Sequence, residues 1–203
     1  MNLIERAKNI LMSPKTEWPV IDGESATPTS LLTSYVVPMV LIGAVASFIG
    51  YGFVGLNFLG FRIAGINWGI AQGVTVLVSG IISYFISTYV IDALAPSFGS
   101  EKNINKSAQL VAYSSTAAWV VAIFNIIPSL GILGLLGLYS VYLFYVGLPI
   151  MKKTPEDKKV VYMIVAALVI IVVAFVINFI LLKIVYAVLG NPYSLGGHNL
   201  FGN

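Results

Sequence analysis

The chain contains no cysteine and only one histidine, His198, among its 203 residues. The lack of cysteine excludes a disulfide framework, a thiolate metal site and a cysteine nucleophile. A metal site needs several converging ligands, and the C-terminal stretch 190–203 that holds His198 has no cysteine or carboxylate. We therefore expect no metal and no other cofactor.

Charge is also scarce. Only 9% of the residues are charged, against about a quarter in an average soluble domain. Hydrophobic residues make up 58% of the chain and the mean hydropathy is +0.93. A soluble chain of this length cannot bury so much apolar surface, so the composition predicts an integral membrane protein in contact with lipid. The basic residues form no extended face, and nucleic acid is not expected as a partner.

Recognisable catalytic patterns are missing as well. The sequence has no phosphate-binding loop, no paired acidic residues and no HExxH motif. Without an acid, a base and a nucleophile or metal on one side of the membrane, we do not expect an enzyme.

Long apolar runs dominate what is present, and each meets the roughly 20 residues that a membrane-crossing helix needs. The predicted fold is an all-α, polytopic membrane domain over residues 31–189, preceded by an arm (1–30) and followed by a tail (190–203). A tight turn at Pro128 should join the third and fourth helices as an antiparallel hairpin, and Pro38 should kink the first. The five predicted transmembrane helices are 31–55, 68–92, 108–127, 130–150 and 160–189.

The distribution of Lys and Arg predicts the orientation. Nine of the eleven fall on one side of the predicted helices, whereas the other side receives Arg62, and Lys183 lies within the last helix. The positive-inside rule then gives a cytoplasmic N-terminus and an extracytoplasmic C-terminus. The nine are Arg6, Lys8, Lys15, Lys102, Lys106, Lys152, Lys153, Lys158 and Lys159.

The N-terminal arm has the pattern of an amphipathic helix. Apolar residues recur at helical spacing from Leu3 to Leu11, while charges interrupt the stretch from Glu5 onward, unlike a secretory leader. Trp18 follows, and its ring suits headgroup depth. Two placements remain open: the arm lies on the cytoplasmic membrane surface, or its apolar stripe packs on the cytoplasmic ends of the transmembrane helices.

The middle of the chain resembles the Yip family of five-helix membrane proteins, first known as interactors of Ypt/Rab GTPases. The resemblance implies the five-helix fold, a cytoplasmic N-terminus and an organising role in the membrane, and "SPKTEW" is similar to the start of many prokaryotic members. The acidic DLYGP-type motif of eukaryotic members is absent, so a small-GTPase role is not among its implications. The motifs that carry the resemblance to the Yip family are Tyr113-Ser114, the Pro128 turn, Leu138-Tyr139-Ser140 and Tyr145-Val146-Gly147-Leu148.

Asp92 is the one carboxylate at the edge of an apolar run. An ionisable group in the membrane is a functional hypothesis by default. If it faces inward beside Tyr113, Ser114 and Ser115, these groups would form a polar pocket for a cation or a lipid headgroup. The plainer interpretation places Asp92 at the interface, where water, Lys102 or Lys106 satisfies it.

Small residues at helical spacing predict close packing between helices. In the second helix they are Gly69, Gly73, Ser79, Ser83 and Ser87, and in the fourth they are Gly131, Gly134 and Gly137. The stripe of the second helix also makes a homo-oligomer plausible.

Other side chains are expected at the lipid headgroups, where Trp and the long Lys side chains are favoured. They are Trp18, Lys152, Lys153, Lys158, Lys159 and Lys183.

Two function classes remain. The first is a non-enzymatic membrane organiser or adaptor that recruits membrane or cytoplasmic protein partners, in a multi-pass protein of a prokaryotic cytoplasmic membrane. The second is a small transporter or channel for ions, lipids or small solutes. The second would need a continuous polar path, and the polar residues are sparse and segregated to the two ends of the predicted helices.

Overall fold

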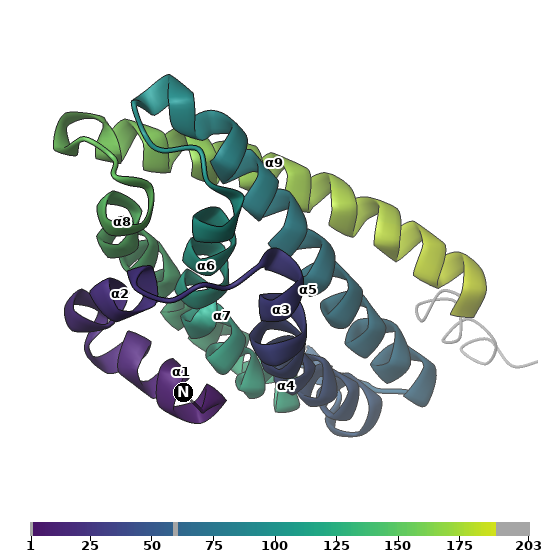
Figure 1. Ribbon diagram of the computed structural model, residues 1–203. Coiled ribbons are helices and arrows are strands. Elements are labelled where there is room, and N and C mark those ends of the chain that lie inside the picture. Colours follow the sequence, from purple (N-terminus) through teal and green to yellow (C-terminus); the bar gives the residue numbers. More distant parts are fainter. Residues whose placement is uncertain (1, 59–60, 190–203) are drawn as a thin grey trace, which may run out of the picture.

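The computed structural model of the protein describes residues 2–58 and 61–189, and the described part is a helical bundle (Figure 1). Five stretches in it are long and apolar enough to cross a membrane, in agreement with the predicted all-α, five-span fold. They are Pro28–Val54, Ile66–Phe98, Ile104–Ile126, Pro128–Lys152 and Glu156–Val185. The expected tail, 190–203, lies outside the described residues.

The two longest helices, α5 (Ile66–Leu94) and α9 (Glu156–Leu189), pack against each other, and α9 forms one edge of the bundle (Figure 1). The other α-helices are α1 (Leu3–Met12), α2 (Pro14–Asp22), α3 (Pro28–Leu31), α4 (Val37–Ile49), α6 (Ile104–Ser114), α7 (Thr116–Val121) and α8 (Tyr139–Lys152).

The first and second spans are joined by a structure that the sequence did not predict. Strands β1 (Leu56–Phe58) and β2 (Phe61–Ile63) form a short antiparallel hairpin. The guanidinium of Arg62 donates to the carbonyls of Val54, at 2.9 Å, and Phe53. It thereby satisfies carbonyls at the end of the preceding helix, which would otherwise lack intrahelical partners.

The spans are not uniformly α-helical. A π-helical turn, η1 (Leu32–Val36), stands just before Pro38, whose missing N–H already disturbs the helix there. A second π-helical turn, η2 (Gly50–Val54), ends the first span. Segments of 3-10 helix are η3 (Ala95–Phe98), η4 (Ala122–Ile126) and η5 (Pro128–Leu138).

Glycines allow α5 to lie close against the first span. A Cβ added at Gly69 would stand 2.6 Å from the carbonyl oxygen of Phe48 and 2.7 Å from the Cα of Gly52. One added at Gly73 would stand 3.1 Å from the carbonyl oxygen of Ala44. This face of α5 is therefore covered within the chain, and a second copy of the protein would need another surface.

The other small residues of the predicted stripes have different surroundings. Ser79 and Ser83 line a cavity of about 270 Å³ between α4 and α5, and Ser87 is buried. Gly137 lies near Ala118 of the third span, whereas Cβ atoms added at Gly131 or Gly134 would meet nothing within 4 Å. Of the three glycines in this predicted stripe, Gly137 alone therefore lies against the third span.

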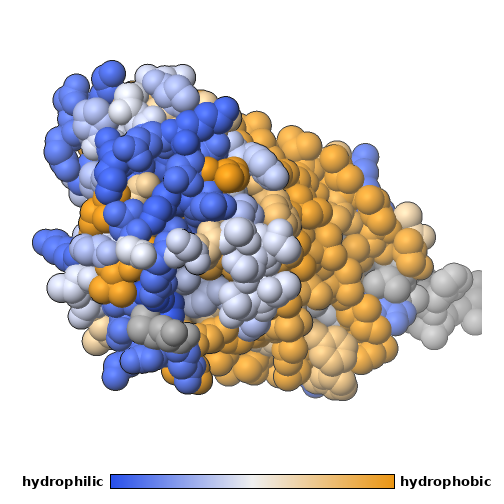
Figure 2. All heavy atoms as spheres, viewed as in Figure 1, coloured by the Kyte–Doolittle hydropathy of each residue, from blue (hydrophilic) through white to orange (hydrophobic). Residues whose placement is uncertain are grey.

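Polar and apolar residues are segregated along the bundle. Figure 2 shows hydrophilic residues gathered at one end, over the arm and the neighbouring loops, and a broad hydrophobic surface along the rest of the face in view. Leu168, Phe175 and Val188 of α9 are each more than half exposed. Such a surface is the one that a bilayer covers.

Candidate functional site

The arm formed by α1 and α2 is docked on the polar end of the bundle, which decides between its two predicted placements in favour of bundle packing (Figure 1). Trp18 is fully buried, and its indole N–H donates to the carbonyl of Leu143 in α8 at 3.1 Å. Gly147 makes room for the ring, since a Cβ added there would stand 2.5 Å from it. Trp18 thus lies in a protein socket and not among lipid headgroups.

Polar contacts fix the end of the arm. Asp22 forms ion pairs of 3.0 Å with both Lys106 and Lys153. The buried Gln109 side chain donates to the carbonyls of Ile21, at 3.2 Å, and Glu24, at 3.1 Å. Partial burial opposes ionisation of Asp22, but the hydrogen bonds and charges of the two lysines outweigh it and hold the pKa of this carboxyl below its ordinary value.

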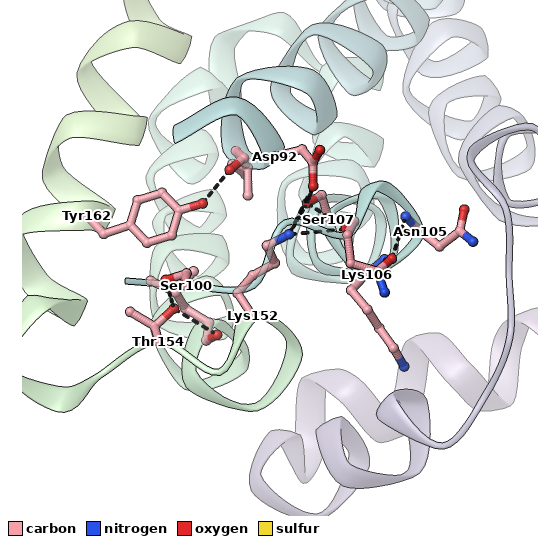
Figure 3. A network of polar contacts seen from close by, with 11 residues as sticks. Asp92, Ser100, Asn105, Lys106, Ser107, Lys152, Thr154 and Tyr162 are labelled. Atoms are coloured by element: carbon pink, nitrogen blue, oxygen red, sulfur yellow. Dashed lines mark hydrogen bonds and ion pairs between the residues drawn. The ribbon is translucent and has the colours of Figure 1, made fainter. Parts of the chain in front are cut away.

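A buried charge network lies where α5, α6 and α8 meet (Figure 3). The ammonium of Lys152 is fully buried and donates to Asp92 at 3.1 Å and to the hydroxyl of Ser107 at 2.7 Å. Its third hydrogen bond, 3.1 Å long, goes to the carbonyl of Asn103. All three protons of the ammonium therefore have acceptors, which is what a buried lysine requires.

Neighbouring contacts tie α9 to the same junction. The hydroxyl of Tyr162 donates to the carbonyl of Ile91, and the hydroxyls of Ser100 and Thr154 lie 2.8 Å apart (Figure 3). Each of these polar groups is paired inside the chain. The arrangement therefore holds four helices together.

The sequence-predicted pocket is not assembled around Asp92. Ser107 of α6 meets this carboxylate, and no hydrogen bond or ion pair within 2–58 and 61–189 joins it to Tyr113, Ser114 or Ser115. Tyr113 lies six residues beyond Ser107, about 9 Å further along the helix at 1.5 Å per residue. Ser114 and Ser115 donate to the carbonyl of Val111 within α6.

Tyr113 instead belongs to a second polar cluster, between the arm and the bundle. Its ring meets that of Tyr35 edge-on, with centroids 4.8 Å apart, and the guanidinium of Arg6 lies 5.3 Å from its centroid. Arg6 is buried and forms ion pairs with Glu17 and Glu24. A cavity of about 360 Å³ opens beside this cluster.

Several lysines expected at the headgroups have protein partners. Lys152 is buried in the network above, because the α8 segment that carries it turns into the core. The ammonium of Lys159 lies 3.9 Å from the centroid of the Tyr145 ring, and that of Lys183 lies 4.7 Å from the centroid of Phe179. Lys153 reaches Asp22, while Lys158 is exposed.

Sequence reasoning missed Arg6, Glu17, Ser107 and Gln109 as structural contacts. A signal existed for Arg6, because positions 3, 6, 7 and 10 share one face of a helix, and Arg6 therefore belongs to the apolar stripe of α1. Its burial at 4% exposure follows from that spacing together with the carboxylate of Glu17. No local pattern marks Ser107 or Gln109.

Comparison with known proteins identifies the family to which the chain belongs. No curated protein and no solved structure matches the chain significantly. The family model described as Yip1 domain matches residues 8–178. The match concerns the family as a whole and does not bear out the narrower expectation of a prokaryotic-type member. A match over that much of the 203 residues, together with five apolar spans, places this multi-pass membrane protein in the Yip1-domain family.

Proposed function

We propose that this protein is a non-enzymatic membrane organiser or adaptor, whose five-helix domain holds a folded arm at the membrane surface for protein partners in membrane or protein trafficking and homeostasis. The observation that carries the proposal is the docking of α1 and α2, which makes the arm part of the core through Trp18. A docked arm presents one constant surface, and binding to it does not have to order a flexible segment.

The outward side of the arm offers both apolar and charged groups to such a partner. Ile4 and Met12 are 74% and 75% exposed, and Val20 is half exposed. Lys8 and Lys15 are exposed on the same two helices. A mixed surface of this kind suits a partner that binds and leaves, since fully apolar surfaces are typical of permanent interfaces.

We place this end of the molecule in the cytoplasm, with an extracytoplasmic C-terminus. The arm and the chain segments around the α5–α6 and α8–α9 connections carry nine of the eleven Lys and Arg residues, and the positive-inside rule assigns such segments to the cytoplasm. Because the chain has no cysteine, a single one introduced at Val20 or His198 is a clean probe. An impermeant maleimide added to intact cells should label position 198 and spare position 20, and the reverse pattern would invert the orientation.

The transporter alternative is less well supported by the contacts within the spans. Asn125 donates to the hydroxyl of Ser47 at 3.0 Å. Thr88 donates to the carbonyl of Tyr84 at 2.8 Å. Each of these polar side chains therefore has a hydrogen-bond partner within the protein. The cavity that Pro38, Leu41 and Val45 help to line has almost entirely apolar walls. Neither feature offers an ion or polar solute a hydrated route.

Two measurements test the proposal. In sealed liposomes, the purified protein should give no flux of ions or of fluorescent lipids above that of empty liposomes. In native membranes, a photo-crosslinker at Met12 should capture a discrete protein partner from the wild type. Capture should be lost in Trp18→Ala, which releases the arm, and kept in Leu168→Ala, which truncates an exposed residue of α9 away from the arm. Flux above background, or capture unaffected by Trp18→Ala, would refute the adaptor role.

A further inference from the structure

The cavity beside Arg6 lies between the arm and the first and third spans. Its volume is about 360 Å³, within the range of small-ligand sites. The arm and the segment after it contribute four of its lining residues, α6 contributes one and the first span contributes two. The seven are Leu3, Arg6, Glu24, Ser25, Ser34, Tyr35 and Tyr113.

The charges at this cavity favour a cation. Arg6 is the single positive charge of its cluster, and it is held between two carboxylates, those of Glu17 and Glu24. The cluster therefore carries one net negative charge. The Glu17 side chain is 8% exposed, whereas that of Glu24 is 41% exposed, so Glu24 retains oxygen lone pairs for another donor.

The aromatic residues supply the complementary contacts. Tyr35 and Tyr113 form a T-shaped pair, and since the guanidinium of Arg6 already lies over the Tyr113 ring, the pair supplies aromatic walls for the carbon atoms of a ligand. The hydroxyl of Tyr35 is bonded to Thr116 at 2.7 Å. The hydroxyl of Tyr113 has no hydrogen-bond partner in the described part of the chain, so it can accept a hydrogen bond from a ligand at the cavity wall.

The position of the cavity indicates where the ligand comes from. Ser34 and Tyr35 lie six and seven residues into the first candidate span, about 10 Å from its start at 1.5 Å per residue. The cavity therefore lies near the polar end of this span, the end at which lipid headgroups would meet the protein. Ser25 and Ser34 are both exposed and line the cavity, but the hydroxyl of Ser34 already donates to the carbonyl of Ser30 at 2.7 Å, so Ser25 is the serine from which a phosphate could accept a hydrogen bond.

We propose that this cavity binds the primary ammonium of a phospholipid headgroup of the phosphoethanolamine type. The carboxylate of Glu24 and the hydroxyl of Tyr113 accept hydrogen bonds from it, and the aromatic pair surrounds the methylene groups of the headgroup. A primary ammonium donates three hydrogen bonds, which a quaternary ammonium cannot do. The site goes beyond the adaptor role, because it would give the docked arm a direct dependence on the composition of the surrounding leaflet.

Lipid retention measured by native mass spectrometry tests this site on the full chain. The protein is purified in detergent with phosphatidylethanolamine, phosphatidylcholine and phosphatidylglycerol of identical acyl chains. Wild type should retain phosphatidylethanolamine most strongly. Glu24→Gln should lower this retention by about tenfold, the loss expected for one charge-assisted hydrogen bond. Glu5→Gln, which removes the same charge from the exposed face of α1, should leave it unchanged.

A second variant keeps the test valid if Glu24→Gln loosens the arm. Tyr113→Phe removes one oxygen and keeps the ring against Tyr35, so it should weaken retention without lowering the melting temperature in the absence of lipid. Soluble phosphoethanolamine separates the possible sources of the ammonium group. Competition at millimolar concentration would mean that a free amine suffices, whereas competition by the lipid alone would assign the site to the bilayer.

Equal retention of the three lipids by wild type, or unchanged retention in both Glu24→Gln and Tyr113→Phe, would overturn the proposal. Preferred retention of phosphatidylglycerol would contradict the proposal that the cavity selects a positively charged headgroup. These results are independent of the adaptor role, which is tested by liposome flux and partner capture. Either proposal can therefore fail while the other holds.

Discussion

The indole N–H of Trp18 donates to the backbone carbonyl of Leu143, 125 residues later in the chain, at 3.1 Å. This contact joins the second helix of the arm to the last helical segment of the fourth span. Both side chains are fully buried. The arm is therefore part of the hydrophobic core, and its position depends on the same packing that holds the spans together.

Replacing Trp18 by alanine should release the arm. The substitution removes a large buried ring and its hydrogen bond, changes of the kind that cost about 3–5 kcal/mol in protein cores. Trypsin should then cleave at Lys8 and Lys15 at least tenfold faster, while the spans stay inserted in the membrane. Val20→Ala is the matched control, because Val20 is half exposed on the same helix. Equal cleavage of the two variants would contradict the socket.

Gly147→Ala should have the same effect from the opposite side of the socket. The added methyl would stand 2.5 Å from the Trp18 ring and 2.8 Å from a methyl carbon of Leu110, so the ring must leave. Gly134→Ala provides the comparison, since an added Cβ there meets nothing within 4 Å. In a chain in which Trp68 and Trp119 are replaced by phenylalanine, the background for every fluorescence measurement here, the Trp18 emission should move toward that of a solvated indole in the first variant only. An unchanged spectrum in Gly147→Ala would show that the socket tolerates the methyl.

The pair formed by Lys152 and Asp92 should be costly to break from one side. Lys152→Met leaves a buried carboxylate without its counter-ion, an effect of about 3–5 kcal/mol. Adding Asp92→Asn should recover much of the loss, because no buried charge then remains. Thermal unfolding in detergent measures this double-mutant cycle, with the exposed Lys158→Met as a control for charge. Strictly additive losses would mean that the two side chains act independently.

Acid should weaken arm docking through Asp22. Its pKa in the docked arm lies below the ordinary 3.8 because Lys153 and Lys106 outweigh the effect of burial. The contribution of this carboxylate is therefore complete above pH 3.8 and is lost as the pH falls through the lowered pKa. Asp22→Asn should weaken docking at neutral pH and flatten the acid profile measured by Trp18 fluorescence. Identical profiles for wild type and variant would exclude the two lysine contacts.

Length and composition were enough to predict the five spans. Each apolar run is continuous over about 20 residues, and the membrane allows only helices at such places. The 3-10 helix η5 was not predicted, although Gly131, Gly134 and Gly137 recur at its period of three residues per turn. The same spacing fits an α-helix nearly as well, and the sequence alone does not separate the two.

The polar contacts were harder to predict. Counting Lys and Arg places Asp92 and Lys152 at the same end of the bundle, but the expected partners of Asp92 were water or Lys102 and Lys106, which are nearer in sequence. The structure pairs Lys106 with Asp22 and Lys152 with Asp92, because packing of α6 against α8 decides which side chains meet. Two residues that lie 60 positions apart in the sequence meet only through tertiary packing, so no local sequence pattern predicts their contact.

The most direct test of the central claim is a distance measurement between the arm and the bundle in lipid nanodiscs. The chain has no native cysteine, so spin labels at Val20→Cys and Asp157→Cys, both exposed, report on this pair alone. A docked arm gives one narrow distance distribution, which broadens when Trp18→Ala is added. A broad distribution in the chain that retains Trp18 would contradict a docked arm, and with it the fixed platform on which the adaptor role depends.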